Sequence, residues 1–189
     1  MTSEIDTSPF TACPEPFNMA DHVLKAGRAT PDKVALSVVS ATHSEDWTFA
    51  ELETAIRGVA AGFLARGLCV GYRVLMRLGN TPDFPISYLA SIAVGLIPVP
   101  TSSQLTASEV NKIAKDINPA LIVADNGIAL PDHGAPVLMA EKLRTYHSLP
   151  PAPFDFGDSN RPAYIIYTSG TSGKPRAVVH AHRAVWARQ

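Results

Sequence analysis

The sequence predicts an α/β fold in which layered sheets carry flanking helices. Amphipathic helix patterns alternate along the chain with short apolar strand patterns, which is typical of this class. Two Thr-x-x-Glu capping boxes, at residues 48–51 and 106–109, mark helix starts. Residues 73–78 indicate a strand, and residues 120–124 indicate a short apolar strand. A chain of 189 residues is long enough for one domain, or a large piece of one, with a real core.

The first elements follow from local capping and proline signals. Asn18 is a suitable cap for a short helix that carries Val23 and Leu24, and Pro31 prevents that helix from continuing. Residues 34–39 read as a buried strand, and residues 40–46 as its return turn.

The helix after Thr48 has the most complete set of signals. The Thr48 hydroxyl can accept the backbone N–H of Glu51 while the Glu51 carboxylate reaches back, and Trp47 and Leu52 occupy hydrophobic-staple positions. Gly67 is a natural residue to follow the C-terminus. Helical spacing predicts an inward face made of Leu52, Ile56, Val59, Phe63 and Leu64.

Residues 73–78 predict a strand, and residues 80–83 predict the start of a helix that ends at Gly95. The inward residues of this helix are expected to be Phe84, Tyr88, Leu89 and Ile92. Pro98 and Pro100 make residues 96–100 extended and exclude a full hydrogen-bonding ladder on both sides.

The second capping box, at Thr106, opens a helix that ends at residues 118–119. Its buried residues are expected to be Val110, Ile113 and Ile117. Residues 120–124 and 137–139 follow as short strands.

The domain organisation is predicted from composition. Residues 1–17 form a flexible arm, 18–146 an α/β subdomain, and 147–162 a proline-rich linker. Residues 163–189 are expected to form a strand, a phosphate loop, a second strand and the start of a helix, which is truncated.

Composition excludes several classes of function. Sixteen basic and seventeen acidic residues give a net charge of −1, which argues against a nucleic-acid partner or a polybasic membrane patch. Cys13 and Cys69 form no CxxC pair, so neither a disulfide framework nor a zinc site is indicated. The mean hydropathy is +0.08, and the longest apolar run, residues 86–100, is too short to span a bilayer. A cytoplasmic protein with no membrane partner is expected.

Residues 168–176, Thr-Ser-Gly-Thr-Ser-Gly-Lys-Pro-Arg, combine the groups that phosphate oxygens need. Glycines let backbone N–H groups approach an anion, hydroxyls add donors, and the two cations add charge. The alternative is a polar hairpin with solvated cations. Two residues separate Gly170 from Gly173, whereas a P-loop has four between its glycines, so a P-loop is excluded. The nucleophile elbow GxSxG is also excluded, because Gly173 follows Ser172 directly.

Residues 167–178 resemble the signature phosphate loop of the adenylate-forming superfamily, which includes acyl- and aryl-CoA synthetases, luciferases and peptide-synthetase adenylation domains. The usual family pattern is Tyr-Thr-Ser-Gly-Thr-Thr-Gly-x-Pro-Lys-Gly-Val. The sequence departs from it at Ser172, Arg176 and Ala177. Segments 47–52, 71–74, 93–100 and 104–107 are also similar to stretches of acyl- and aryl-CoA ligases. The resemblance therefore covers the chain from about Asn18 onward.

The resemblance implies the N-terminal part of the adenylate-forming large domain. The parent enzyme would use ATP and Mg²⁺ to convert a carboxylic acid to an acyl adenylate, and would then transfer the acyl group to CoA. The family's metal-associated Glu, acyl pocket and catalytic lysine lie downstream of this loop. We therefore expect no catalytic residue and no metal ligand within the fragment, which should be inactive alone. The phosphate-binding residues carried over are Thr168, Ser169, Gly170, Thr171, Ser172, Gly173, Lys174 and Arg176.

Three points stay open at the sequence level. A non-catalytic module for oligomerisation or weak nucleotide binding is the alternative function. His180 and His182 have a spacing compatible with metal, although packing or an active-site wall is favoured. Val185 and Trp186 are expected to form a core face that has lost its partners, which would promote self-association. The similarity of residues 93–107 to medium-chain and benzoate-type ligases implies an acid that is small and aromatic or of medium length.

Overall fold

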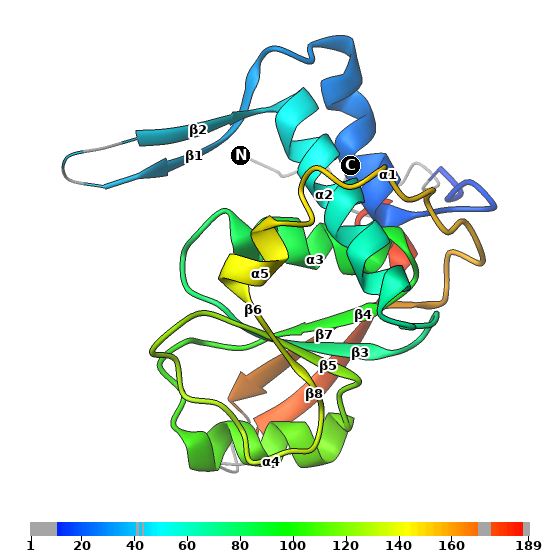
Figure 1. Ribbon diagram of the computed structural model, residues 1–189. Helices are drawn as coiled ribbons and strands as arrows, with labels where there is room; N and C mark the ends of the chain where they lie inside the picture. Colours follow the sequence, from blue (N-terminus) through cyan, green and yellow to red (C-terminus); the bar gives the residue numbers. More distant parts are fainter. Residues whose placement is uncertain (1–10, 41, 43, 170–174, 187–189) are drawn as a thin grey trace, which may run out of the picture.

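The computed structural model describes residues 11–40, 42, 44–169 and 175–186. A parallel sheet with strand order β4-β3-β5-β6 lies at the centre of the molecule (Figure 1). Its strands are β3 (Arg73–Arg77), β4 (Ile97–Pro100), β5 (Leu121–Ala124) and β6 (Val137–Met139). The predicted α/β class is confirmed, and the proline-containing strand β4 lies at a sheet edge, as its missing N–H groups require.

Two layers cover the sheet (Figure 1). One contains α1 (Met19–Lys25), α2 (Phe49–Ala65), α3 (Asp83–Ala93) and α5 (Ala140–Arg144); the other contains α4 (Ala107–Ile117) and the hairpin β7–β8. Val74 and Met76 pack into the α1–α3 core, whereas Leu75 packs into the α4 core. Both faces are apolar because both are buried, which is typical of parallel sheets.

Helix α2 begins and ends as predicted. Thr48 accepts the Glu51 N–H at 3.2 Å, and the Glu51 carboxylate accepts the Thr48 N–H at 2.9 Å. At the other end Gly67 has φ +79°, and the N–H of Leu68 donates to the Phe63 carbonyl, which completes a Schellman motif. Leu64 is 42% exposed, so its predicted inward position is wrong. It lies at the margin of the apolar face.

Helix α4 also matches its signals. The second capping box is complete, with the Glu109 N–H 3.3 Å from the Thr106 hydroxyl. Val110, Ile113 and Ile117 are buried, as predicted. Asn118 ends the helix in the left-handed conformation, with φ 43°, which asparagine tolerates better than most residues.

The predicted strand at 34–39 exists, but its predicted burial is wrong. β1 (Val34–Val39) pairs with β2 (Ser44–Thr48) in a two-stranded hairpin that extends away from the layers (Figure 1). Leu36 packs against the core, whereas Val39 is 76% exposed. The predicted turn at 40–46 is too long, since Ser44 already belongs to β2.

Two short elements were not predicted. Helix α5 buries Leu143, and the 3-10 helix η1 (Ala26–Ala29) follows α1 directly. A five-residue helix is too short to show a 3.6-residue period in the sequence.

Asn18 connects three distant segments. Its side-chain oxygen accepts the N–H groups of Ala20 and Asp21 at the start of α1. Its amide nitrogen donates to the carbonyls of Ile92, Ala93 and Asp155. The predicted cap is therefore confirmed, and it also fixes the segment after Pro150 on the end of α3. The predicted domain boundaries stay predictions.

Among the residues that the structure describes, no helix combines the length and apolar content needed to cross a lipid bilayer.

We expect Thr48→Ala to lower the free energy of unfolding by about 1 kcal/mol, because the Glu51 N–H loses its acceptor and the Glu51 carboxylate loses the Thr48 hydroxyl. Thr54→Ala is the matched control: Thr54 is exposed on the same helix and its hydroxyl only donates to the Ala50 carbonyl. The control should change stability by less than about 0.5 kcal/mol. Urea unfolding of both variants measures the difference, and equal losses would contradict the capping account.

Candidate functional site

The candidate phosphate loop connects strands β7 (Pro162–Ser169) and β8 (Pro175–Ala181). The strands pair antiparallel, with Thr168 opposite Arg176 and Ser169 opposite Pro175. The side chains of Thr168 and Arg176 are exposed at this end of the hairpin. The other predicted contacts of the loop lie outside the described residues: Gly170, Thr171, Ser172, Gly173 and Lys174.

Two contacts hold β7 against the body of the protein. Ile165 is buried in the core that α4 shares with the sheet. The Tyr167 hydroxyl donates a hydrogen bond to the Asp116 carboxylate near the end of α4. Burial and this hydrogen bond raise the pKa of Tyr167, so it remains a donor at neutral pH. The base of the candidate loop is therefore tied to a rigid helix.

One face of the hairpin changes from aromatic to polar along its length. Tyr164 stacks on His180 with ring centroids 4.5 Å apart, and Tyr88 from α3 lies 5.6 Å from Tyr164. Burial, together with the neighbouring Tyr164, raises the pKa of Tyr88. Because residues two apart on a strand share a face, the Ile166–Val178 pair follows, and then the Thr168–Arg176 pair.

A cavity of about 520 Å³ lies where β3 and β4 end. Ligands of open parallel sheets bind at this carboxyl edge. Ile166 of β7 also lines the cavity, so the hairpin that carries the candidate loop forms part of its wall. The lining residues are Leu78, Asn80, Phe84, Pro100, Thr101, Ser102, Ser103, Gln104 and Ile166.

Arg77 is the residue of this region that the sequence reading missed. It is fully buried at the end of β3, and its guanidinium bonds to the stretch 101–105 that lines the cavity. A cation inside the apolar run 73–78 was the available signal, since an arginine is almost never fully buried without a partner.

His180 and His182 do not act together. His180 stacks on Tyr164, whereas His182 is fully buried and its Nδ1 accepts the Met19 N–H at 3.0 Å. Burial, and to a lesser extent the neighbouring Arg161, lower the pKa of His182 to about 4, against the opposing effect of Asp155. Within the described residues, no group of three or more His, Cys, Asp or Glu side chains is arranged to hold a metal ion.

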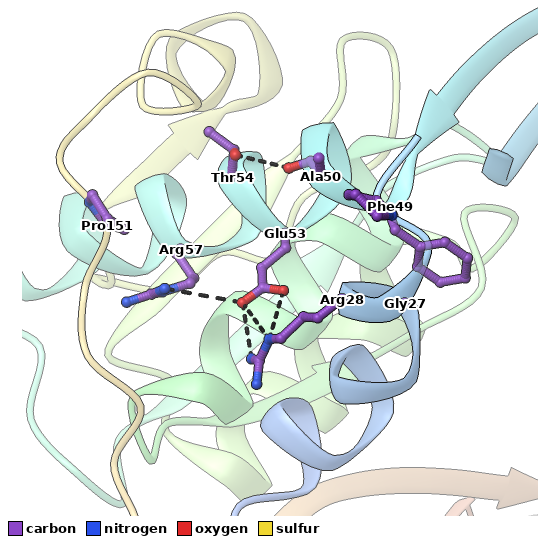
Figure 2. A pocket seen from close by; sticks show the side chains of 9 residues that line it. Gly27, Arg28, Phe49, Ala50, Glu53, Thr54, Arg57 and Pro151 are labelled. Carbon is purple, nitrogen blue, oxygen red and sulfur yellow. Dashed lines mark hydrogen bonds and ion pairs between the residues drawn. The ribbon is translucent and has the colours of Figure 1, made fainter. Parts of the chain in front are cut away.

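A second cavity, of about 320 Å³, lies on the helical layer (Figure 2). Figure 2 shows Glu53 between Arg28 and Arg57. The Arg28 guanidinium is bidentate on Glu53, and Arg57 lies 3.9 Å from the same carboxylate. Arg28 also pairs with Asp21 at 2.9 Å, so two carboxylates balance the two guanidiniums. None of the described site residues predicted from sequence lines this cavity.

Trp186 packs against other parts of the chain, so the expectation that it belongs to an unpartnered core face is wrong. Its indole N–H donates to the Thr11 carbonyl at 2.8 Å, and its ring contacts Phe17 and His22 edge-on. The N-terminal segment from Thr11 therefore covers it. The apolar side chains that the hairpin exposes are Ile166, Val178 and Val179.

Comparison with known families decides the identity of this arrangement. The model of the AMP-binding enzyme family matches residues 23–188, which contain the central sheet and the candidate phosphate loop. The chain belongs to the AMP-binding enzyme family. The resemblance found in residues 167–178 is thereby confirmed.

Curated relatives of this AMP-binding chain include several kinds of ligase. It is 30% identical to the medium/long-chain-fatty-acid–[acyl-carrier-protein] ligase FadD10 of Mycobacterium tuberculosis, over 94% of the chain and 35% of FadD10. It is 31% identical to a 4-chlorobenzoate–CoA ligase of Arthrobacter sp, over 84% of the chain and 32% of that ligase. The chain thus spans about a third of the length of these relatives.

Solved structures agree on the fold. A benzoate CoA ligase from Burkholderia xenovorans LB400 matches 90% of the AMP-binding chain with a TM-score of 0.76 and 20% identity, over 36% of that ligase. The acetoacetyl-CoA synthetase from Streptomyces lividans matches 89% of the chain with a TM-score of 0.77 and 24% identity, over 31% of that synthetase.

We expect the stability of the chain to fall as pH drops from about 6.5 to about 4, in part through His182. Its Nδ1 accepts a hydrogen bond, so protonation breaks the contact with Met19. In the folded state the pKa of His182 is lowered from 6.5 to about 4. As the pH falls, the unfolded state therefore takes up the proton before the folded state does, and the resulting loss of stability begins only below about pH 6.5.

The test compares wild type with His182→Asn, whose side-chain oxygen retains an acceptor but does not titrate. Between pH 7 and pH 4.5 wild type should lose about 2 kcal/mol more than the variant in urea unfolding. Equal losses would show that His182 does not carry this pH dependence.

Proposed function

We propose that the chain supplies the phosphate loop and the central sheet of an ATP-dependent carboxylate–CoA ligase. In this reaction a carboxylic acid attacks the α-phosphate of ATP, pyrophosphate leaves, and the acyl group of the adenylate passes to the CoA thiol. The observation that carries the proposal is the exposed Thr168–Arg176 pair, at the end of a hairpin beside the carboxyl edge of the sheet, in a member of the AMP-binding enzyme family.

The chain's own residues would bind and orient the leaving pyrophosphate. The Thr168 hydroxyl can donate to a phosphate oxygen, and the Arg176 guanidinium can bind two such oxygens with its planar fork. Residues 169–174 would add glycine backbone N–H groups, hydroxyls and the Lys174 charge. Positive charge placed before the reaction stabilises the charge that develops on pyrophosphate.

Mg²⁺ would arrive with the nucleotide. The described residues offer no carboxylate cluster for it, so we assign it no protein ligand in this chain. We assign no catalytic residue to the chain either.

CoA is proposed as the acceptor because of the similarity of segments 93–100 and 104–107 to CoA ligases. The relatives act with CoA or with an acyl-carrier protein, by their names. We propose a cytoplasmic enzyme of fatty or aromatic acid metabolism, with a small aromatic or medium-length acid as substrate. The coding DNA beyond Gln189 offers an inexpensive test: an open frame that continues into a Tyr-Gly-x-Thr-Glu segment supports the ligase, whereas a stop codon favours a stand-alone module.

We expect no carboxylate-dependent ATP–pyrophosphate exchange by residues 1–189 alone, because the family's acyl pocket and catalytic lysine are supplied from elsewhere. The assay should cover aromatic and medium-length acids, with a complete acyl-CoA ligase as positive control. Turnover by the chain alone would overturn the proposal that it needs further segments.

We expect residual binding of ATP at millimolar concentration, which isothermal titration can measure. Arg176→Ala should weaken it about tenfold, because a charge-assisted bidentate contact is lost. Arg183→Ala is the matched control, since Arg183 is also exposed but follows the other end of β8. No heat for folded wild type, or the same loss in both variants, would contradict the assignment of Arg176.

A further inference from the structure

We propose that Arg77 is a positioning residue that holds residues 101–105 as the wall of the 520 Å³ cavity, and that this cavity binds an uncharged, hydrogen-bonding segment of a ligand. The inference rests on the proposed function only for the identity of that ligand. We define the cavity and its lining residues as the β3–β4 cleft.

The Arg77 guanidinium is satisfied entirely by uncharged oxygens. Its Nε donates to the Ala129 carbonyl at 2.9 Å, and one terminal nitrogen donates to the Thr101 hydroxyl at 3.1 Å. The remaining N–H groups donate to main-chain carbonyls of the loop after β4, which belong to Ser102, Ser103 and Leu105. No described carboxylate forms an ion pair with Arg77.

Such an arrangement is costly for stability alone. Burial of a cation without a counter-ion carries a large desolvation penalty, and apolar residues of similar volume usually stabilise a core at least as well. Arg77 shares a sheet face with Leu75, which packs in the apolar α4 core. Unlike leucine, the Arg77 guanidinium can hydrogen-bond several carbonyls at once and can therefore fix the path of a loop that has no secondary structure of its own.

The loop held by Arg77 is also the polar wall of the cleft. The Thr101 hydroxyl both accepts from Arg77 and donates to the Met76 carbonyl at 2.8 Å, so Thr101 is fixed to the end of β3. Ser102, Ser103 and Gln104 line the cavity and are exposed. Within the described residues, the backbone N–H groups of Ser102 and Ser103 have no acceptor, so they remain available to a ligand.

The lining defines the chemistry of the ligand. The cleft combines hydroxyl and amide groups with the apolar side chains of Leu78, Phe84, Pro100 and Ile166, and none of the described residues that line it is ionisable. A charged group would lose hydration there without gaining a counter-ion. Thr168 lies two residues beyond Ile166 on β7, roughly 7 Å along the strand. A ligand held at the phosphate loop could therefore extend an uncharged segment into the cleft.

Two sources supply such a segment in the proposed reaction: the body of the carboxylic acid, or the amide-bearing arm of the thiol acceptor. Two neutral probes distinguish them. Benzamide represents an aromatic body with an amide, and pantetheine represents the amide-bearing thiol arm. Neither carries phosphate or carboxylate, so their binding does not depend on the phosphate loop, and failure of the adenylation proposal would leave this test unaffected.

The experiment measures amide hydrogen exchange and probe binding for wild type, Arg77→Met and Arg77→Lys. Arg73→Met is the matched control, because Arg73 on the same strand also donates to main-chain carbonyls, those of Ile117 and Asn118 at the C-terminus of α4, but at the opposite end of the sheet. Gln104→Ala tests the cleft without touching the core, since Gln104 is exposed.

Wild type should bind one of the probes saturably in ligand-observed NMR, and the probe that binds identifies the source. In Arg77→Met, exchange of the hydrogen-bonded amides of Thr101, Gln104 and Leu105 should accelerate roughly tenfold, and probe binding should weaken by a similar factor. Arg77→Lys should recover part of the slow amide exchange and part of the probe binding. Gln104→Ala should weaken probe binding and leave amide exchange unchanged. Arg73→Met should change neither amide exchange nor probe binding.

The positioning role is overturned if the amides of Thr101, Gln104 and Leu105 in folded Arg77 variants exchange as in wild type, or if Arg73→Met gives the same acceleration. The ligand site is overturned if neither probe binds wild type, or if Gln104→Ala leaves binding unchanged. If both Arg77 variants fail to fold, while Arg73→Met folds, Arg77 is a residue of the core and the positioning role is rejected.

Discussion

Leu75 of β3 packs against α4 and the β7–β8 hairpin, while its neighbours Val74 and Met76 pack against the α1–α3 layer. The central strands are thus buried on both sides, and each apolar side chain contributes roughly 1.5–3 kcal/mol by leaving water. The hairpin can cover its part of the sheet only in one register, with Ile165 inward. That register in turn places Thr168 and Arg176 at the carboxyl edge. The position of the candidate loop is therefore a consequence of core packing.

The parts of the fold that could be predicted from sequence are those fixed by interactions within a few residues. Thr48 and Glu51, or Thr106 and Glu109, recognise each other across one helical turn, so their geometry does not depend on the rest of the chain. Burial of β1 could not be predicted in this way. Its apolar composition suits a central strand, but its position depends on which strand pairs with it, and β2 is its partner in a hairpin that extends from the body.

The candidate site also has a part that local sequence could predict and a part that depends on long-range contacts. The composition of residues 168–176 predicted a phosphate site, and family membership supports that interpretation. The cleft beside it could not be predicted, because residues 77, 101–105 and 129 meet only after β3 and β4 have paired. Likewise the partner of Trp186 is Thr11, which lies at the other end of the chain. Long-range contacts of this kind leave no periodic signal in the sequence.

We infer that a chain with this sheet and loop belongs to an enzyme that activates carboxylic acids with ATP. The decisive measurement is carboxylate-dependent exchange of labelled pyrophosphate into ATP by the protein encoded by the complete open reading frame. We expect exchange that requires one class of acid and that falls at least about tenfold in Arg176→Ala. If a folded, complete protein shows no exchange over a broad panel of acids, the protein does not activate carboxylic acids with ATP.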